Sequence, residues 1–135
     1  MPLAAHEVIV GNVAILDGDS LFADTQVDHG PRTDKLGIGH RPFLCIESDG
    51  SHCSWVMLTT QHNPKRLLLD QWKVPGSPKW MRDTQYLCDA REVLRGPVSA
   101  FITAGKEELP HKPHIRHSVS KNGIDAVLRE IEKYS

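Results

Sequence analysis

Two apolar runs stand out in the pattern of hydrophobic and polar residues along the chain, Phe43–Ile46 and Val56–Leu58. Between them lies Ser48-Asp49-Gly50-Ser51, whose Asp-Gly pair favours a tight turn. The pattern therefore predicts an antiparallel hairpin of strands 41–46 and 54–60. In such a hairpin the start of the first strand and the end of the second lie at the same edge of the sheet.

Shorter apolar segments predict further strands. Residues 7–16 (EVIVGNVAIL) form a first strand region, with Gly11-Asn12 as a turn or bulge, and residues 85–88 form a short strand. Residues 66–72 are another strand candidate. Residues 98–103 fit either a strand or the start of a helix.

Near the C-terminus the apolar residues change to helical spacing. Positions i, i+3, i+4 and i+7 are occupied by Ile124, Val127, Leu128 and Ile131. This spacing predicts a helix over 122–134 with one apolar face, and Asn122 fits its N-cap. Such a face must be covered by the chain itself or by a second copy.

Two segments lack a regular period: 17–39 is a long acidic loop, and 106–118 is an irregular segment rich in His and Pro. Several short strands and one terminal helix indicate a single domain, 1–135, that is mainly β. The expected architecture is a compact β-barrel with helical additions. Periodicity alone does not separate an SH3-like barrel from an OB-type barrel.

The charge is balanced overall but unevenly distributed. A formal net charge of -1 over 135 residues argues against a protein that coats nucleic acid indiscriminately. Acidic residues dominate 1–34, whereas basic residues outnumber acidic ones in 60–95. RNA would therefore prefer the middle of the chain. The alternative is that both segments are ordinary solvated surfaces.

The N-terminus lacks a secretory signal and no apolar run reaches membrane-spanning length, so a soluble, cytoplasmic protein with no membrane partner is expected. The cysteines Cys45, Cys53 and Cys88 lie in or beside strand patterns and form no CxxC pair. They are interpreted as reduced core residues. A catalytic cysteine is the alternative.

Residues with useful chemistry gather at the predicted hairpin edge. Gly39-His40-Arg41-Pro42 leads into the first strand, and Thr59-Thr60-Gln61 ends the second. The guanidinium offers permanently charged, planar donors, and the threonines add short neutral ones, a combination that suits a phosphodiester. A plain surface cation and ordinary β-branched strand residues are the alternatives.

The order GHRP, apolar strand, turn, apolar strand, TTQ resembles the MazF/PemK family of bacterial toxins, and 84–89 (TQYLCD) resembles the third motif of that family. The resemblance covers residues 8–102 with gaps. It implies an SH3-like barrel of the MazF/PemK/CcdB type with a C-terminal helix, a homodimer, and a cognate antitoxin as partner. It also implies a metal-independent endoribonuclease without a cofactor, which cleaves single-stranded RNA through its 2′-hydroxyl and leaves a 2′,3′-cyclic phosphate.

The resemblance also implies roles for individual residues. Arg41 would stabilise transition-state charge, Thr59 would bind a non-bridging oxygen, and Asp89 would transfer the proton. Apart from the resemblance, His40 is a second candidate for the proton transfer. Histidine titrates nearest to neutral pH, which favours His40, although a structural role is its alternative. The loop 17–39 would border the RNA groove and, being acidic, compete with the substrate as a lid.

Other residues complete the expected RNA surface. Contacts are predicted from Thr60, Gln61, Lys65, Lys79, Trp80 and Arg82. Trp80 stands between cations and is the best candidate for an exposed ring that stacks on a base, whereas Trp55 is expected in the core. The histidines His111, His114 and His117 do not predict a metal site, because no Cys or carboxylate nearby completes a ligand set.

The chain departs from the family pattern at three positions. Leu87 stands where the PemK branch has an arginine, Ala90 replaces the usual glutamine, and Leu36 falls where a charged residue is common. These departures leave two alternatives to the enzyme. One is a catalytically weakened barrel that binds nucleic acid or a protein, and the other is an ordinary structural domain.

Overall fold

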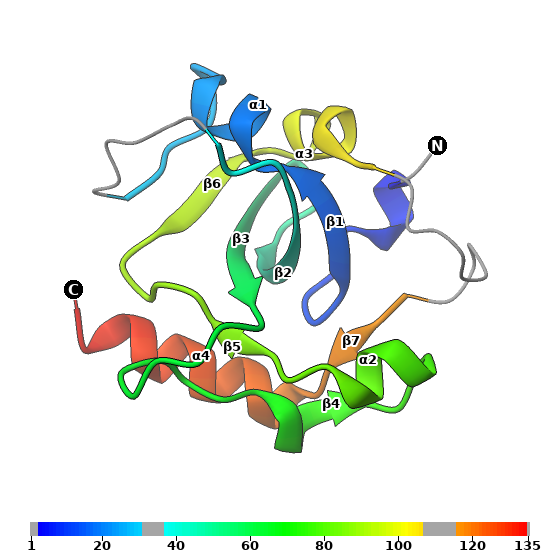
Figure 1. Ribbon diagram of the computed structural model, residues 1–135. Helices are drawn as coiled ribbons and strands as arrows, with labels where there is room; N and C mark the ends of the chain where they lie inside the picture. The colour runs from blue at the N-terminus through cyan, green and yellow to red at the C-terminus, as the bar shows by residue number, and fades with distance from the viewer. Residues whose placement is uncertain (1–2, 31–36, 107–115, 135) are drawn as a thin grey trace.

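The computed structural model describes residues 3–30, 37–106 and 116–134 and has an antiparallel sheet at its centre (Figure 1). The strand order is β1-β2-β3-β5, β6 also pairs with β3, and a small separate sheet joins β4 to β7. The strands are β1 (Val13–Asp17), β2 (His40–Ser48), β3 (His52–Thr59), β4 (Lys73–Val74), β5 (Tyr86–Leu87), β6 (Val93–Pro97) and β7 (Ser118–Val119). The helices are α1 (Gly18–Ala23), α2 (Pro78–Arg82), α3 (Val98–Ala104) and α4 (Lys121–Glu132), with short 3-10 helices at Ala5–Glu7 and Asp70–Trp72.

The prediction of a mainly β fold with helical additions is confirmed. Within the described residues, the strand pairing runs from β1 at one edge to β5 and β6 at the other and does not close into a barrel. The choice between barrel types made from the sequence therefore stays a prediction.

The predicted central hairpin is confirmed. β2 and β3 pair antiparallel, with Phe43 opposite Met57. At the tip, the Asp49 carboxylate accepts hydrogen bonds from the backbone N–H groups of His52 at 2.8 Å and Ser51 at 2.9 Å. These bonds lower the pKa of Asp49 to about 2, so the turn keeps its charged acceptor at neutral pH.

The hairpin is buried on both faces, because successive side chains of a strand point to opposite sides. Phe43 and Trp55 face a core that α1 and α3 cover, whereas Leu44 and Val56 face a second core that α4 covers. Figure 1 shows α1 and α3 on one side of the sheet and α4 on the opposite side. Burial on both faces explains why these strands are continuous apolar runs rather than alternating ones.

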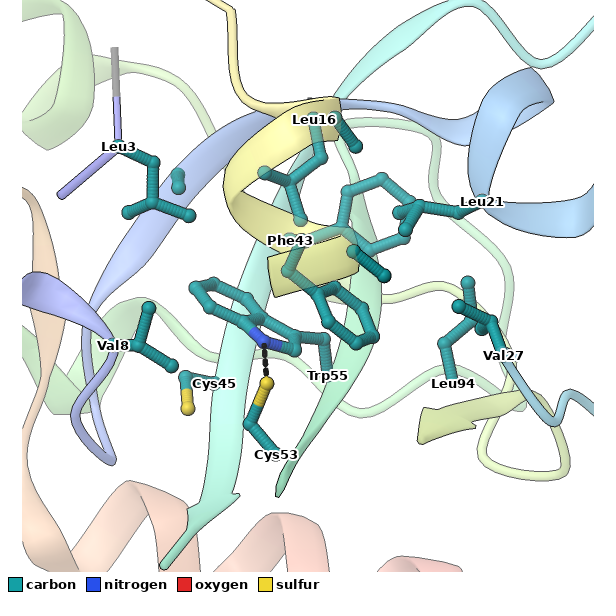
Figure 2. Close-up of a cluster of buried hydrophobic side chains, with 14 of the residues drawn as sticks. Leu3, Val8, Leu16, Leu21, Val27, Phe43, Cys45, Cys53, Trp55 and Leu94 are labelled. Carbon is teal, nitrogen blue, oxygen red and sulfur yellow. Dashed lines mark hydrogen bonds between the residues drawn. The ribbon is translucent and has the colours of Figure 1, made fainter. Parts of the chain in front are cut away.

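The first core is built around Trp55, which is fully buried as predicted. Figure 2 shows its indole N–H pointing at the Cys53 sulfur, and the two atoms are 3.2 Å apart. The Trp55 ring stacks on Phe101 with 5.9 Å between ring centroids. Cys45 lies in the same core, and burial raises the pKa of its thiol to about 12, so the prediction of a core cysteine is confirmed here.

Two predictions for the first part of the chain are wrong. The segment before Gly11 is not a strand but a 3-10 helix and a turn, and the Asn12 side chain fixes it by donating to the Glu7 carbonyl at 2.9 Å. The 17–39 segment is not wholly a loop, because it contains α1. The Asp17 carboxylate accepts from the Ser20 N–H at 3.3 Å and so acts as the N-cap of α1.

The prediction of a strand at 66–72 is also wrong. This segment runs alongside β5 through single backbone bonds, from Leu87 N–H to the Leu67 carbonyl and from Leu69 N–H to the Gln85 carbonyl, both 2.9 Å. It then turns into a 3-10 helix, and Leu69 is buried without any strand alternation. Residues 98–104 form a helix, which resolves the ambiguity of that segment.

The C-terminal helix is confirmed, although Ser120 rather than Asn122 is its N-cap. Ile124 and Val127 are buried in the second core of the same chain, and Leu128 is 41% exposed. The apolar face is therefore covered largely by its own sheet and does not by itself require a second copy.

A buried ion pair fastens the N-terminal segment to the chain that leads into β7. Arg116 Nε donates to Glu7 Oε2 at 2.8 Å, and Arg116 Nη2 donates to Glu7 Oε1 at 3.0 Å. The two side chains are only 10% and 14% exposed. The hydrogen bond from Arg116 is the main cause that lowers the pKa of Glu7.

Replacing Arg116 with methionine is expected to reduce the free energy of unfolding by about 3 kcal/mol at neutral pH, because the buried carboxylate loses its partner. Since the pKa of Glu7 is lowered in the folded state, this stabilisation is present above the pKa of an unfolded glutamate and fades as pH falls through the folded pKa. Urea denaturation at several pH values should show the two proteins converging in acid. Arg129→Met, an exposed change on α4, is the control, and an equal loss in both variants would contradict the role of the pair.

Candidate functional site

The hairpin edge predicted to carry the site borders a cleft of about 320 Å³. The β2–β3 register, continued two residues past the Phe43–Met57 pair, brings Arg41 opposite Thr59. Both residues line this cleft, which we call the first cleft. Its other lining residues include Gly37, Ile38, Thr60, Gln61, Arg66 and Cys88.

Arg41 and Thr59 both retain donors for a ligand. Arg41 is exposed, and within the described part of the chain no carboxylate or carbonyl engages its guanidinium. The Thr59 hydroxyl oxygen accepts the Gln61 N–H at 3.2 Å, which leaves the hydroxyl proton available. A charged fork and a neutral O–H thus meet in one cleft, as binding of a phosphodiester requires.

One wall of the first cleft is a piece of backbone with two glycines at positive φ, and an acidic side chain holds it in place. Gly37 and Gly39 have φ of +81° and +69°, a conformation that side-chain-bearing residues rarely adopt. The Asp19 carboxylate accepts from the Ile38 N–H at 2.9 Å and from the Gly39 N–H at 3.3 Å. Asp19, which the sequence places in an acidic lid, therefore builds the wall of the cleft.

Arg66 is a site residue that the sequence did not single out. Its Nε donates to the Cys88 carbonyl and its Nη1 donates to the Gln61 carbonyl, both at 3.0 Å. It thus ties the loop after β3 to the chain after β5. The only signal in the sequence is the basic pair Lys65-Arg66, which does not indicate which cation is fixed.

A second cleft, of about 360 Å³, adjoins the first, and both are lined by Arg66 and Cys88. It contains Asp89, whose carboxylate accepts from Arg91 Nε and Nη2, each at 3.2 Å. Burial raises the pKa of Asp89, but the hydrogen bonds from the Arg91 side chain and amide outweigh it, so the pKa lies below its ordinary value. Asp89 is therefore a carboxylate at neutral pH, and its lowered pKa makes it a weak base.

The structure divides the predicted site residues into three groups. The first cleft is lined by Arg41, Thr59, Thr60 and Gln61, and the second by Lys65 and Asp89. Neither cleft is lined by the exposed residues His40, Lys79 and Arg82. His40 precedes Arg41 in β2 and so points to the other side of the strand. Lys79 and Arg82 lie on α2.

The expectation that Trp80 offers an exposed ring is wrong. Trp80 is 3% exposed, its indole N–H donates to the Val74 carbonyl at 3.0 Å, and its ring stacks on His117 with 4.9 Å between centroids. Lys73 also lies over the ring at 4.9 Å from its centroid. Ser77 caps α2 and turns Trp80 inward, so the ring packs in the second core.

The acidic residues expected to form a lid do not cover the first cleft where the structure describes them. The Asp24 carboxylate accepts from the Gln26 N–H at 2.8 Å. Asp28 pairs through its backbone with Arg95 of β6, at 2.8 Å and 2.9 Å. Asp34, another acid of the 17–39 segment, and Leu36, where the family commonly has a charged residue, lie outside the described residues.

Two of the three histidines weighed as metal ligands, His111 and His114, also lie outside the described residues. His117 accepts or donates a hydrogen bond with Ser77 at 2.9 Å in addition to its stacking on Trp80. Over residues 3–30, 37–106 and 116–134, no group of three or more His, Cys, Asp or Glu side chains is placed to hold a metal ion.

Comparison with known proteins identifies no relative: no family model, curated protein or solved structure matches the chain. None of the helices in the described ranges is long and apolar enough to cross a membrane.

Replacing Asp19 with alanine is expected to accelerate amide hydrogen exchange at Ile38 and Gly39, because both N–H groups lose their charged acceptor. The free energy of unfolding should fall by about 2 kcal/mol, the usual effect of a hydrogen bond to a charged group. Hydrogen exchange measured by NMR tests both statements. Asp28→Ala, an exposed acid in the same segment, is the matched control; unchanged exchange at Ile38 in the Asp19 variant would mean that other contacts hold the wall.

Proposed function

We propose that the protein is a metal-independent endoribonuclease that cleaves single-stranded RNA in the first cleft. The observation that carries this proposal is that Arg41, which no carboxylate or carbonyl of the described residues engages, lines the same cleft as the Thr59 hydroxyl at one sheet edge. The resemblance to the MazF/PemK toxins supports it from the sequence. A mainly antiparallel sheet followed by a terminal helix is compatible with the SH3-like barrel of that family.

In the proposed reaction the 2′-oxygen of a ribose attacks the adjacent phosphorus and the bond from phosphorus to the 5′-oxygen breaks. The products are a 2′,3′-cyclic phosphate and a 5′-hydroxyl. The Arg41 guanidinium stabilises the charge that builds on the phosphoryl oxygens, and Thr59 donates to a non-bridging oxygen. Asp89 or His40 accepts the 2′-hydroxyl proton, and the leaving 5′-oxygen takes a proton from water.

A second candidate function is favoured by a specific observation, the separation of the proton-transfer residues from the first cleft. Asp89 lies in the second cleft and is engaged by Arg91, and His40 lines neither cleft. With Arg41 and Thr59 alone the cleft would bind RNA without cleaving it. The alternative function is therefore a nucleic-acid-binding or protein-binding module.

The endoribonuclease should cleave a long single-stranded transcript in the presence of EDTA and leave cyclic phosphate ends. Arg41→Ala should lower the cleavage rate at least about 100-fold, because it removes the cation from the charge that develops in the transition state. Thr59→Val should lower the rate by about 10-fold, as expected for one neutral hydrogen bond. Sequencing of the mapped ends measures the first result, and single-turnover rates measure the second.

The matched control is Arg129→Ala, which removes an exposed arginine of α4 outside both clefts and should cleave like the wild type. Cleavage no faster in the wild type than in the Arg41 variant would reject the enzyme. RNA binding that depends on Arg41 but is not followed by cleavage would establish the binding module instead.

The same proposal includes a cognate antitoxin, a homodimer and action on cytoplasmic RNA, all of which depend on the family resemblance. The dimer has less support than the sequence suggested, since the α4 face is largely covered within the chain. Light scattering at micromolar concentration should nevertheless give the mass of two chains. A monomer that persists at high concentration would remove the dimer from the proposal.

A further inference from the structure

The second cleft has the size and the position of a binding site next to the first. Its volume, about 360 Å³, is within the range of small-molecule sites. Three segments that are distant in sequence form it: the loop 63–67, the chain 87–91, and the end of α4 with the residues after it. Because Arg66 and Cys88 line both clefts, a bound chain could pass from one to the other without leaving the surface.

The lining combines apolar side chains with an aromatic ring. Leu87 and Ala90 are buried in the second core, and Leu67 packs against that core. Tyr134 lines the same cleft and is 52% exposed, so about half of the residue's surface is open to solvent. An exposed aromatic ring at a cleft whose other lining is mostly polar suits a planar group such as a nucleobase, which stacks on the ring while its edges and phosphate meet polar groups.

The charges of the cleft leave a cation available. The Asp89 carboxylate is neutralised by Arg91, and the Glu130 carboxylate pairs with Lys133 at 2.8 Å. Lys65 is exposed, and within the described ranges no carboxylate pairs with it. Arg66 is held beside it by two backbone carbonyls. The rim of the second cleft therefore carries unneutralised positive charge. It lies where the phosphate backbone of an RNA strand bound in the first cleft would continue.

We infer that the second cleft binds one nucleotide of a single-stranded RNA, the neighbour of the nucleotide whose phosphate lies at Arg41. The base stacks on Tyr134 and the phosphate pairs with Lys65. This inference uses the RNA ligand of the proposed function but does not depend on cleavage. It assigns the stacking role that the buried Trp80 cannot fill.

The test measures binding of a fluorescent 2′-O-methyl RNA hexamer, in which the methyl group prevents attack by the 2′-oxygen. Tyr134→Ala should weaken binding about 10-fold, as expected for one lost base stack, whereas Tyr134→Phe should bind like the wild type. With a hexamer that lacks bases, Tyr134→Ala and the wild type should bind equally. Fluorescence anisotropy gives these affinities without any need for turnover.

Lys65→Ala should reduce the slope of log affinity against log salt by about 0.7, the value for one phosphate contact on a single strand. Lys121→Ala, an exposed lysine at the start of α4 and outside both clefts, is its control and should leave the slope unchanged. The inference would be overturned if Tyr134→Ala left the affinity for the hexamer unchanged. It would also be overturned if Tyr134→Ala lowered the affinity for the hexamer lacking bases by the same factor. Failure of the proposed function looks different: the wild type would bind the hexamer through Tyr134 but would not cleave an unmodified transcript.

Discussion

The constraint on which the rest of the structure depends is the burial of the β2–β3 hairpin on both faces. Trp55, Phe43 and Leu44 are fully inaccessible, and their side chains divide between the two cores. Each such side chain contributes roughly 2 kcal/mol through removal of apolar surface from water. A one-residue slip in the hairpin would exchange the faces and put the wrong side chains into both cores, so the register is strongly specified.

That register also fixes the candidate site. Arg41 and Thr59 are at the ends of the two buried strands, and they share a cleft because the strands cannot slide past one another. Each polar residue stands only two positions beyond the pair Phe43–Met57. The core thus holds the backbone under the site rigid while leaving the polar ends of both strands at the surface.

Around this hairpin the site is completed by single polar contacts between distant segments. Asp19 holds one wall through two backbone N–H groups, and Arg66 ties the loop after β3 to the chain after β5 through two carbonyls. These charged side chains stabilise the backbone around the site, because a hydrogen bond is stronger when its donor or acceptor is charged. The same contacts determine which charges remain available: Asp19 and Arg66 are engaged, whereas within residues 3–30, 37–106 and 116–134 no partner engages the side chain of Arg41 or Lys65.

The hairpin, the C-terminal helix and the apolar setting of Cys45 and Trp55 could be predicted from the sequence, because each depends on a local period or on a turn between neighbours. The placement of Arg41 opposite Thr59 could also be predicted, because the turn between the two strands makes them pair antiparallel. The short α1 was not predicted, because an aspartate that caps a helix, as Asp17 does, and an aspartate that ends a strand occur in similar local sequences. Only the tertiary structure decided that Trp80 is buried and that Asp19 builds a wall of the first cleft. It also decided that Arg66 connects two loops and that Tyr134 and Lys65 line one second cleft. Each of these depends on contacts between residues far apart in the chain, and no local pattern encodes which distant segment will supply the partner.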